Sequence, residues 1–173
     1  IDFIVNLEDT EEEVWFSPSK LERILYNLLS NAFKYTQPGG YVKLSAKLIK
    51  EEKETFVQIS VKDNGRGIPK EAQEQIFESY YQVEKRDHRE GFGLGLSLTR
   101  SLIHMHKGEI RVESEINKGS DFIVTLNVSE DAYNPDERSS ENITTEEIQK
   151  YNQRIKETIE LIPEKLTNKE KDP

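Results

Sequence analysis

Four polar residues in one short stretch have types and spacing that suit phosphate chemistry. Asn27 and Asn31 are four positions apart, and Lys34 and Tyr35 follow Asn31 by three and four positions. On an α-helix these spacings place the side chains in one stripe. An interior asparagine costs a helix about 0.6 kcal/mol relative to alanine, so two of them one turn apart need a reason. Such a row suits a metal-bound polyphosphate; the alternative is a solvated polar face.

The element that must carry this stripe is a helix over 21–36. Its apolar residues recur at i, i+3, i+4, i+7, i+8 and i+11, as on one face of an α-helix. Ser17 can act as its N-cap and Pro18 suits the first helical position, while Gln-Pro-Gly-Gly at 37–40 ends it. The apolar face consists of Leu21, Ile24, Leu25, Leu28, Leu29 and Ala32.

A carboxylate, Asp63, follows a predicted strand and opens a glycine-containing loop, D-N-G-R-G-I. Residues 41–49 and 55–62 predict two strands joined by a charged hairpin loop at 50–54. A carboxylate in this position can accept a hydrogen bond from the exocyclic amine of adenine, whereas guanine presents a carbonyl oxygen that a carboxylate repels. The alternative is an ordinary Asp-Asn-Gly turn at the end of a strand.

A second glycine-rich stretch, G-F-G-L-G-L-S-L at 91–98, precedes a predicted helix that ends at Lys107-Gly108. Glycines at the start of a helix allow backbone N–H groups to approach a phosphate, where the helix dipole also favours negative charge. The G-x-G-x-G spacing differs from the dinucleotide fingerprint, and no P-loop sequence is present, so both of those sites are excluded. This helix carries on one side Leu94, Leu98, Leu102 and Met105.

The remaining segments predict a sheet covered by helices. Short β-rich segments at 2–7 and 14–16 flank an acidic turn, and a closing hairpin pairs 109–115 with 121–128. A short helix is predicted over 69–81. Antiparallel pairs with helices between them indicate an α+β fold in which the helices pack on one face of a mixed sheet.

Composition excludes several classes of protein and site. The chain has 173 residues and a formal net charge of −9, which argues against a nucleic-acid-binding surface. It has no cysteine, so disulfides and thiolate metal sites are excluded. No apolar run approaches the ~20 residues that span a bilayer, and no signal-peptide pattern is present. The first residue is isoleucine and not methionine, so we expect a fragment of a longer protein.

The C-terminal part of the chain differs in charge from the rest. Residues 129–173 carry 12 acidic and 7 basic side chains, a net charge of −5, against −4 for residues 1–128. This shift predicts a domain at 1–128 followed by an acidic tail at 129–173. The tail contains a predicted helix at about 145–162, which we expect to lie on its own domain; a second copy or a following domain are the alternatives. Its narrow apolar stripe consists of Ile148, Tyr151, Ile155, Ile159 and Ile162.

Taken together, these residues give a chain that resembles the ATP-binding catalytic domain of sensor histidine kinases, within the GHKL or Bergerat-fold superfamily. The resemblance covers about residues 1–128. N-L-L-S-N-A-F-K-Y-T matches the family's N box and D-N-G-R-G-I its first glycine box. I-F-E-S-Y-Y-Q matches the aromatic box, G-F-G-L-G-L-S-L the second glycine box, and K-G-S-D-F-I-V-T-L the closing hairpin. It implies a two-layer α/β sandwich in which about three helices cover one face of a mixed, mostly antiparallel sheet.

The resemblance also implies a role for each matching residue. Asn31 would ligate the Mg²⁺ that bridges the phosphates of ATP, Asn27 would face the phosphates, and Lys34 would neutralise their charge; these three form the expected catalytic set. Tyr35 would pack beside the phosphates and ribose, and Asp63 would receive the adenine amine. Three further groups would complete the nucleotide-binding set. The floor of the pocket would consist of Gly65, Gly67 and Ile68, and Phe77 would tether the lid. The turn on the phosphate side would consist of Gly91, Gly93, Leu94, Gly95 and Leu96.

The residue type at position 27 indicates the reaction class. In the hydrolysing relatives a glutamate at this position activates water, and an amide cannot take that proton. The resemblance therefore implies transfer of the γ-phosphoryl group to a histidine on a separate helical-hairpin domain. His88, His104 and His106 lie outside the family's phosphoacceptor pattern. The alternatives are a degenerate nucleotide-binding scaffold without phosphotransfer and an ATP-hydrolysing clamp.

The resemblance implies partners and a location as well. Histidine-bearing dimerisation helices outside this chain would supply the acceptor, and a response regulator or a fused receiver domain would take the phosphoryl group next. The full-length protein would be a homodimer, and the isolated chain a monomer. The domain would lie in the cytoplasm, as part of a membrane-anchored sensor kinase. The polar loop over 82–90 would be the lid that closes over ATP.

Overall fold

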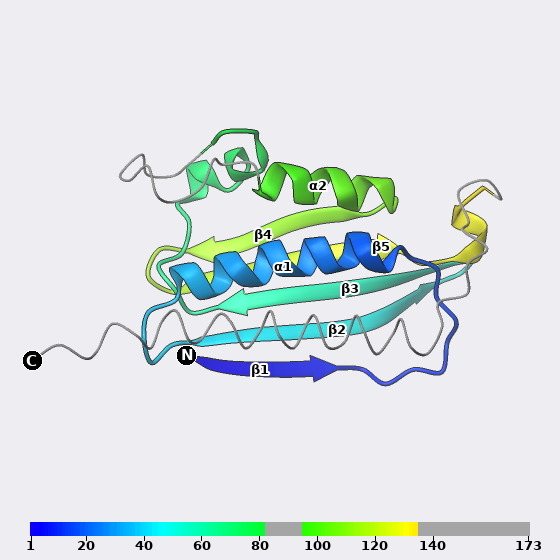
Figure 1. Ribbon diagram of the computed structural model, residues 1–173, viewed down its shortest axis with the longest axis horizontal. Helices are drawn as coiled ribbons and strands as arrows, with labels where there is room; N and C mark the ends of the chain where they lie inside the picture. The colour runs from blue at the N-terminus through cyan, green and yellow to red at the C-terminus, as the bar shows by residue number, and fades with distance from the viewer. Residues whose placement is uncertain (82–94, 135–173) are drawn as a thin grey trace, which may run out of the picture.

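The computed structural model describes residues 1–81 and 95–134, in which five strands form one sheet. The order across the sheet is β1-β2-β3-β5-β4 (Figure 1). The first pairing is parallel and the other three are antiparallel, as the resemblance implies. The strands are β1 (Asp2–Leu7), β2 (Tyr41–Glu51), β3 (Glu54–Asp63), β4 (Glu109–Glu115) and β5 (Gly119–Asn127).

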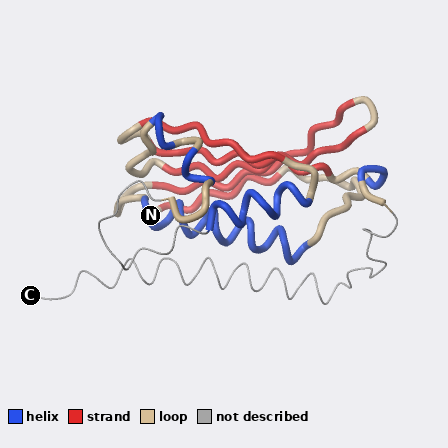
Figure 2. Tube along the Cα trace, turned by 90° about the horizontal axis from the view of Figure 1, so that it is seen from above, coloured by secondary structure: helices blue, strands red, loops and turns tan. Residues whose placement is uncertain are grey.

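Two α-helices, α1 (Pro18–Tyr35) and α2 (Gly95–Met105), cover one face of this sheet. Figure 2 shows both helices on the same side of the strands, so the predicted two-layer fold is confirmed. The short helix predicted over 69–81 is present as two 3-10 turns, η1 (Lys70–Ala72) and η2 (Gln75–Phe77).

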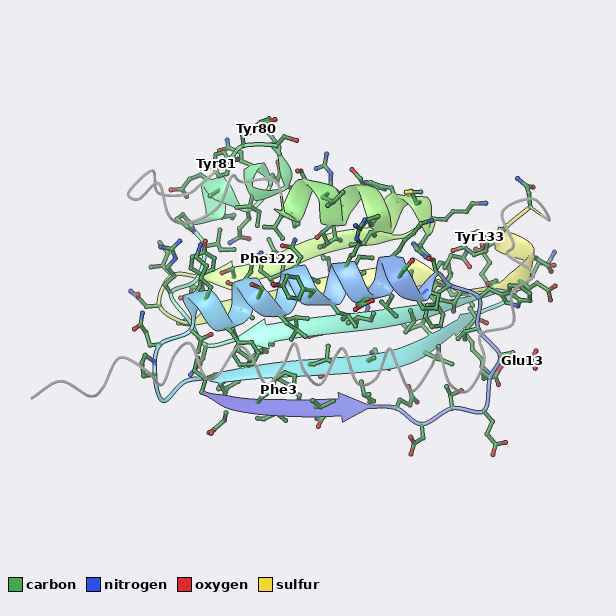
Figure 3. The ribbon with its side chains drawn as sticks, in the orientation of Figure 1. Phe3, Glu13, Tyr80, Tyr81, Phe122 and Tyr133 are labelled. Atoms are coloured by element: carbon green, nitrogen blue, oxygen red, sulfur yellow. The ribbon has the colours of Figure 1, made fainter. Side chains whose placement is uncertain are left out.

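The core lies between α1 and the central strands. Ile24 and Leu28 of α1 are fully buried, and they belong to the same apolar cluster as Val61 of β3 and Leu126 of β5. Phe33 of α1 contacts Phe3 of β1 with 5.5 Å between ring centroids, which joins the edge strand to the helical layer (Phe3 is labelled in Figure 3). The apolar face predicted from the spacing is therefore the face that packs on the sheet.

Two local predictions differ from the structure. The strand predicted at 14–16 is wrong: this segment is irregular, and the Trp15 N–H donates to the Val128 carbonyl at 2.9 Å. The next residues open α1, and Pro18 has no N–H to continue a ladder. The β2–β3 hairpin is longer than predicted because charged residues join its ladder, with Glu51 opposite Glu54.

The apolar residues predicted on one side of α2 are not all buried. Leu94 lies outside the described residues, while Leu98 and Met105 are 54% and 57% exposed. The residues that α2 buries against the rest of the domain are Thr99, Leu102 and Ile103. Within the described residues, no helix combines the length and the apolarity that a membrane crossing requires.

After β5 the chain makes one more turn, η3 (Glu130–Ala132), and remains against the sheet. The Tyr133 hydroxyl donates to the carbonyl oxygens of Asn127, at 2.5 Å, and His106, at 3.2 Å (Figure 3). The described part of the chain thus ends close to the C-terminus of α2. The predicted tail helix at 145–162 lies outside the described residues.

Candidate functional site

The middle of the polar stripe on α1 contacts the N-terminus of α2. The Asn27 Nδ2 donates to the Thr99 Oγ1 at 2.6 Å, and the Thr99 hydroxyl donates to the Gly95 carbonyl at 3.0 Å. A Cβ on Gly95 would lie 2.4 Å from the Asn27 Oδ1. The amide of Asn27 therefore holds the first turn of α2 against α1, and a side chain at position 95 would displace that amide.

The end of the polar stripe contacts the loop that follows β3. The Arg66 N–H donates to the Tyr35 carbonyl at 3.3 Å, and a Cβ on Gly65 would lie 2.3 Å from the same oxygen. The Arg66 guanidinium lies 4.4 Å from the centroid of the Tyr35 ring, and the Lys34 ammonium lies 5.0 Å from it. Two cations thus gather on one aromatic ring at the C-terminal end of α1.

Asp63 is the buried carboxylate of this loop, with only 4% of its surface exposed. Its Oδ1 accepts a hydrogen bond from the Gly65 N–H at 2.8 Å. Burial raises the pKa of Asp63 above its ordinary value of 3.8, and the backbone donors at Gly65 and Ser120 oppose that rise. A carboxylate in this environment gains from one more donor, which is what an adenine amine offers.

The hairpin of β4 and β5 closes over the same loop. Gly67 has a φ of +70°, and a Cβ there would lie 2.0 Å from the Glu115 carbonyl oxygen. A Cβ on Gly119 would lie 1.9 Å from the carbonyl oxygen of Asp63. The loop is therefore packed backbone to backbone between α1 on one side and the hairpin on the other.

Two supporting residues were missed from the sequence. Thr99 is 1% exposed and bonds Asn27, as described above. Ser114 lies on β4; its Oγ accepts from the Ile68 N–H and donates to the Gly119 carbonyl, both at 2.8 Å. The neighbours of Thr99 (L-T-R) and of Ser114 (E-S-E) give no signal for these roles. The contact of Thr99 with Asn27 and that of Ser114 with Ile68 each join segments far apart in the sequence.

The predicted site residues are placed as follows. Phe77 is 7% exposed, and its ring meets Phe122 of β5 edge to face with 6.4 Å between ring centroids, so it lies in the core (Phe122 is labelled in Figure 3). Leu96 is half-buried against the core. Gly91, Gly93, Leu94 and the predicted lid at 82–90 lie outside the described residues.

The described motifs meet along one helix. Asn27 contacts the start of α2, Tyr35 contacts the loop after Asp63, and Asn31 lies one helical turn from each of them. The positive end of the α2 dipole and the cations beside Tyr35 favour an anion along this line. The buried carboxylate of Asp63 favours a hydrogen-bond donor at its far end. Such a site suits a ligand with an amine at one end and phosphates at the other.

Residues 16–130 match the sequence family described as "Histidine kinase-, DNA gyrase B-, and HSP90-like ATPase". The chain belongs to this family. It is 43% identical over 115 residues to the adaptive-response sensory kinase SasA of Synechococcus sp. (strain JA-2-3B'a(2-13)), covering 66% of this chain and 30% of that protein. It is 38% identical over 133 residues to the sensor histidine kinase WalK of Bacillus subtilis (strain 168), covering 76% of this chain and 21% of that protein. The chain thus spans less than a third of these relatives.

Solved structures give the same assignment of the fold. The catalytic domain of the histidine kinase ThkA superposes with a TM-score of 0.61 at 28% identity, over 79% of this chain and 82% of that one. Full-length ShkA in complex with AMPPNP gives a TM-score of 0.63 at 26% identity, over 74% of this chain and 26% of that one. The fold of the described residues is the fold of histidine kinase catalytic domains.

The packing of the loop predicts a difference between two glycines with positive φ. Gly39 has a φ of +80° and open space around its Cβ position, whereas Gly67 has a φ of +70° and the Glu115 carbonyl in the way. Gly39→Ala should cost about 1–2 kcal/mol of unfolding free energy through φ strain. Gly67→Ala should cost a further ~1–3 kcal/mol through overlap. Urea denaturation measures both, and equal losses would contradict the close approach.

Proposed function

We propose that this domain binds Mg-ATP between α1, the loop after β3 and the start of α2, and donates the γ-phosphoryl group to a histidine on a separate dimerisation domain. The observation that carries the proposal is the meeting of the motifs along α1. Asn27 lies against Gly95, and Tyr35 lies against Gly65. Membership of the ATPase family supports ATP as the ligand, and the named relatives SasA and WalK support a kinase.

The adenine end of the proposed site is the loop after β3. The buried, ionised form of Asp63 accepts the adenine amine, while Gly65, Gly67 and Ile68 form the floor. Because the loop is fixed by Tyr35 and by the β4–β5 hairpin, the carboxylate is already in place before nucleotide binds. Tyr35, with its two neighbouring cations, lies between this end and the phosphates.

The phosphate end of the proposed site is the polar stripe. Within the part of the chain that the structure describes, no group of three or more His, Asp or Glu side chains could hold a metal ion. A magnesium ion here would therefore take most of its ligands from phosphates and water, as it does in many nucleotide sites. When bound, the ion would neutralise phosphate charge. Asn31 would supply a hard amide oxygen to it, Lys34 would add a positive charge, and the glycine-rich sequence at 91–95 would offer backbone N–H groups to the phosphates.

The reaction proposed is transfer to an outside acceptor. The Asn27 amide cannot take a proton from water, and its Nδ2 is held by Thr99. His106 is buried, with its Nε2 accepting from the Ser17 N–H and its Nδ1 donating to the Leu102 carbonyl, so neither nitrogen is available as a nucleophile. His104 lies nine residues beyond Gly95 along α2, about 13 Å away. Positioning and charge neutralisation supply the catalysis.

The wider context of the domain belongs to the same proposal. Histidine-bearing dimerisation helices would present the acceptor, and a response regulator or fused receiver domain would take the phosphoryl group from it. The parent protein would be a homodimeric, membrane-anchored sensor kinase with this domain at 1–128 in the cytoplasm, and the isolated domain would be monomeric. The relatives named as sensor kinases support the signalling role, and with it a response-regulator partner. The membrane anchor, the oligomeric states and the domain boundary stay predictions.

Asp63→Asn should weaken the binding of ATP and ADP by about tenfold or more, because a charge-assisted hydrogen bond to adenine is lost. Isothermal calorimetry measures the change. In the unchanged protein the affinity should also fall as the pH is lowered through the raised pKa of Asp63, and this dependence should be absent in the variant. Glu113→Gln, which replaces an exposed carboxylate of β4 that contacts Arg111, is the control. Unchanged affinity in Asp63→Asn would refute the adenine assignment.

Asn31→Ala should remove the gain in ATP affinity that Mg²⁺ provides, since the variant lacks the proposed metal ligand. Calorimetry with ATP in the presence of Mg²⁺ or of excess chelator measures this gain. The same pair of titrations is repeated with ADP. Ser30→Ala, the neighbouring position on α1, should keep the full metal effect. An Asn31→Ala protein with an ordinary magnesium titration would argue against this role.

Incubation of the isolated chain with γ-labelled ATP should leave it unlabelled and release little phosphate, because none of its histidines lies in the phosphoacceptor pattern and position 27 carries an amide instead of a glutamate. Addition of the histidine-bearing helical hairpin of the parent protein should bring label onto the hairpin, and a hairpin with its histidine replaced by glutamine should stay unlabelled. Label on the isolated chain would contradict an external acceptor. Nucleotide binding without transfer would favour a scaffold, and rapid phosphate release would favour a clamp ATPase.

A further inference from the structure

A groove lies between α1 and α2; its lining includes Asn27, Gly95 and Thr99 but no residue of the loop that follows Asp63. The two helices run side by side in Figure 1. Tyr26, Leu98 and Met105 line this groove and are 56%, 54% and 57% exposed. Clusters of exposed large apolar side chains mark interaction surfaces. We call this surface the interhelical groove; its apolar lining consists of Leu25, Tyr26 and Leu29 of α1 and Leu98, Leu102 and Met105 of α2.

The charges along the interhelical groove favour an acidic occupant. Its charged lining consists of two basic residues, Lys20 and Arg23, and one acidic residue, Glu22. The whole chain, by contrast, has a net charge of −9. A locally basic groove in an acidic chain attracts a partner of negative charge.

The described chain ends beside one mouth of the interhelical groove. Ser17, just before α1, donates its N–H to His106, just after α2, so the start of one helix and the end of the other meet. The Tyr133 hydroxyl bonds the carbonyl of that same His106. Ser19 and Met105 line the groove close to this end. Residues beyond Asn134 therefore start next to the groove.

The sequence of the tail fits this groove in pattern and length. Residues 145–162 carry one apolar stripe at helical spacing, and as a helix they would extend about 27 Å, as α1 does with the same number of residues. The ten residues 135–144 can span up to ~33 Å, which is more than enough to reach the groove. The docking segment itself is nearly neutral: residues 145–162 carry four acidic and three basic side chains, a net charge of −1, within a tail (129–173) of net charge −5.

We propose that residues 145–162 form a helix whose apolar stripe packs into the interhelical groove of the same chain. The groove is also lined by Asn27 and Gly95, so a helix lying in it covers one approach to the phosphate end of the site. We expect a docked tail to slow the entry of the acceptor domain, and this functional effect rests on the proposed function. The docking itself does not depend on that function.

Disulfide trapping tests the docking directly, because the chain has no cysteine of its own. Tyr26→Cys is combined in turn with Tyr151→Cys, Ile155→Cys and Ile159→Cys, which lie on the stripe. The matched controls combine it with Gln153→Cys and Glu157→Cys, which lie on the opposite side of the same predicted helix. Mild oxidation at low protein concentration should give an intrachain disulfide in at least one stripe pair, seen by intact mass and non-reducing electrophoresis, and none in the controls.

Other outcomes of the trapping overturn the docking. Equal trapping of stripe and control pairs would mean that the tail does not pack, and disulfides between chains would mean that a second copy occupies the groove. A pair of Tyr41→Cys with Ile155→Cys tests whether the tail packs on the other face of the sheet instead. Tyr41 in β2 points away from the helical layer, because it is next to Val42, which is buried under that layer. Trapping there in preference to Tyr26 would overturn the assignment to the groove.

The consequence for function is tested separately. Removal of residues 135–173 should raise the rate of label transfer to the added hairpin severalfold while ATP affinity stays unchanged. A trapped stripe pair without any rate effect leaves the docking in place and overturns only the shielding. Absence of transfer in both chains, with ATP bound, would overturn the proposed function and leave the trapping result as it stands.

Discussion

The candidate site depends on three places where main chains approach more closely than a side chain would allow. Gly65 lies against the Tyr35 carbonyl, Gly67 against that of Glu115, and Gly119 against that of Asp63. Together they join the end of α1, the loop after β3 and the β4–β5 hairpin into one unit. Because each approach needs a missing Cβ, the glycines of the motif are required by packing even before a nucleotide is considered.

This packing has an electrostatic consequence for Asp63. The same backbone contacts that fix the loop also remove its carboxylate from water, and burial raises its pKa. Backbone N–H groups at Gly65 and Ser120 offset part of that cost. The carboxylate is thus held with its acceptor capacity incompletely used, which favours a ligand that brings its own donor.

The sequence predicts those parts of the fold whose causes are local. The helix α1 follows from its apolar period, from Pro18 and from the glycines that end it, and its burial confirms the predicted face. The segment at 14–16 is a wrong prediction because β-rich composition does not supply a neighbouring strand. Thr99 and Ser114 went unpredicted since their partners are distant in sequence: Asn27 is 72 positions from Thr99. The placement of Asn31 toward a metal and of Asp63 toward adenine stays a prediction.

The two ends of the candidate site are built differently, and the difference suits their proposed tasks. At the adenine end, main-chain contacts from α1 and from the β4–β5 hairpin leave the loop little freedom. At the phosphate end, the described link between α1 and α2 is a side-chain bond between Asn27 and Thr99. A side-chain bond can be exchanged at small cost for a bond to a ligand, whereas a packed backbone cannot move without disrupting the core. In the proposed site, the base would therefore meet a fixed surface, while the groups around the phosphates would adjust as the triphosphate becomes a diphosphate.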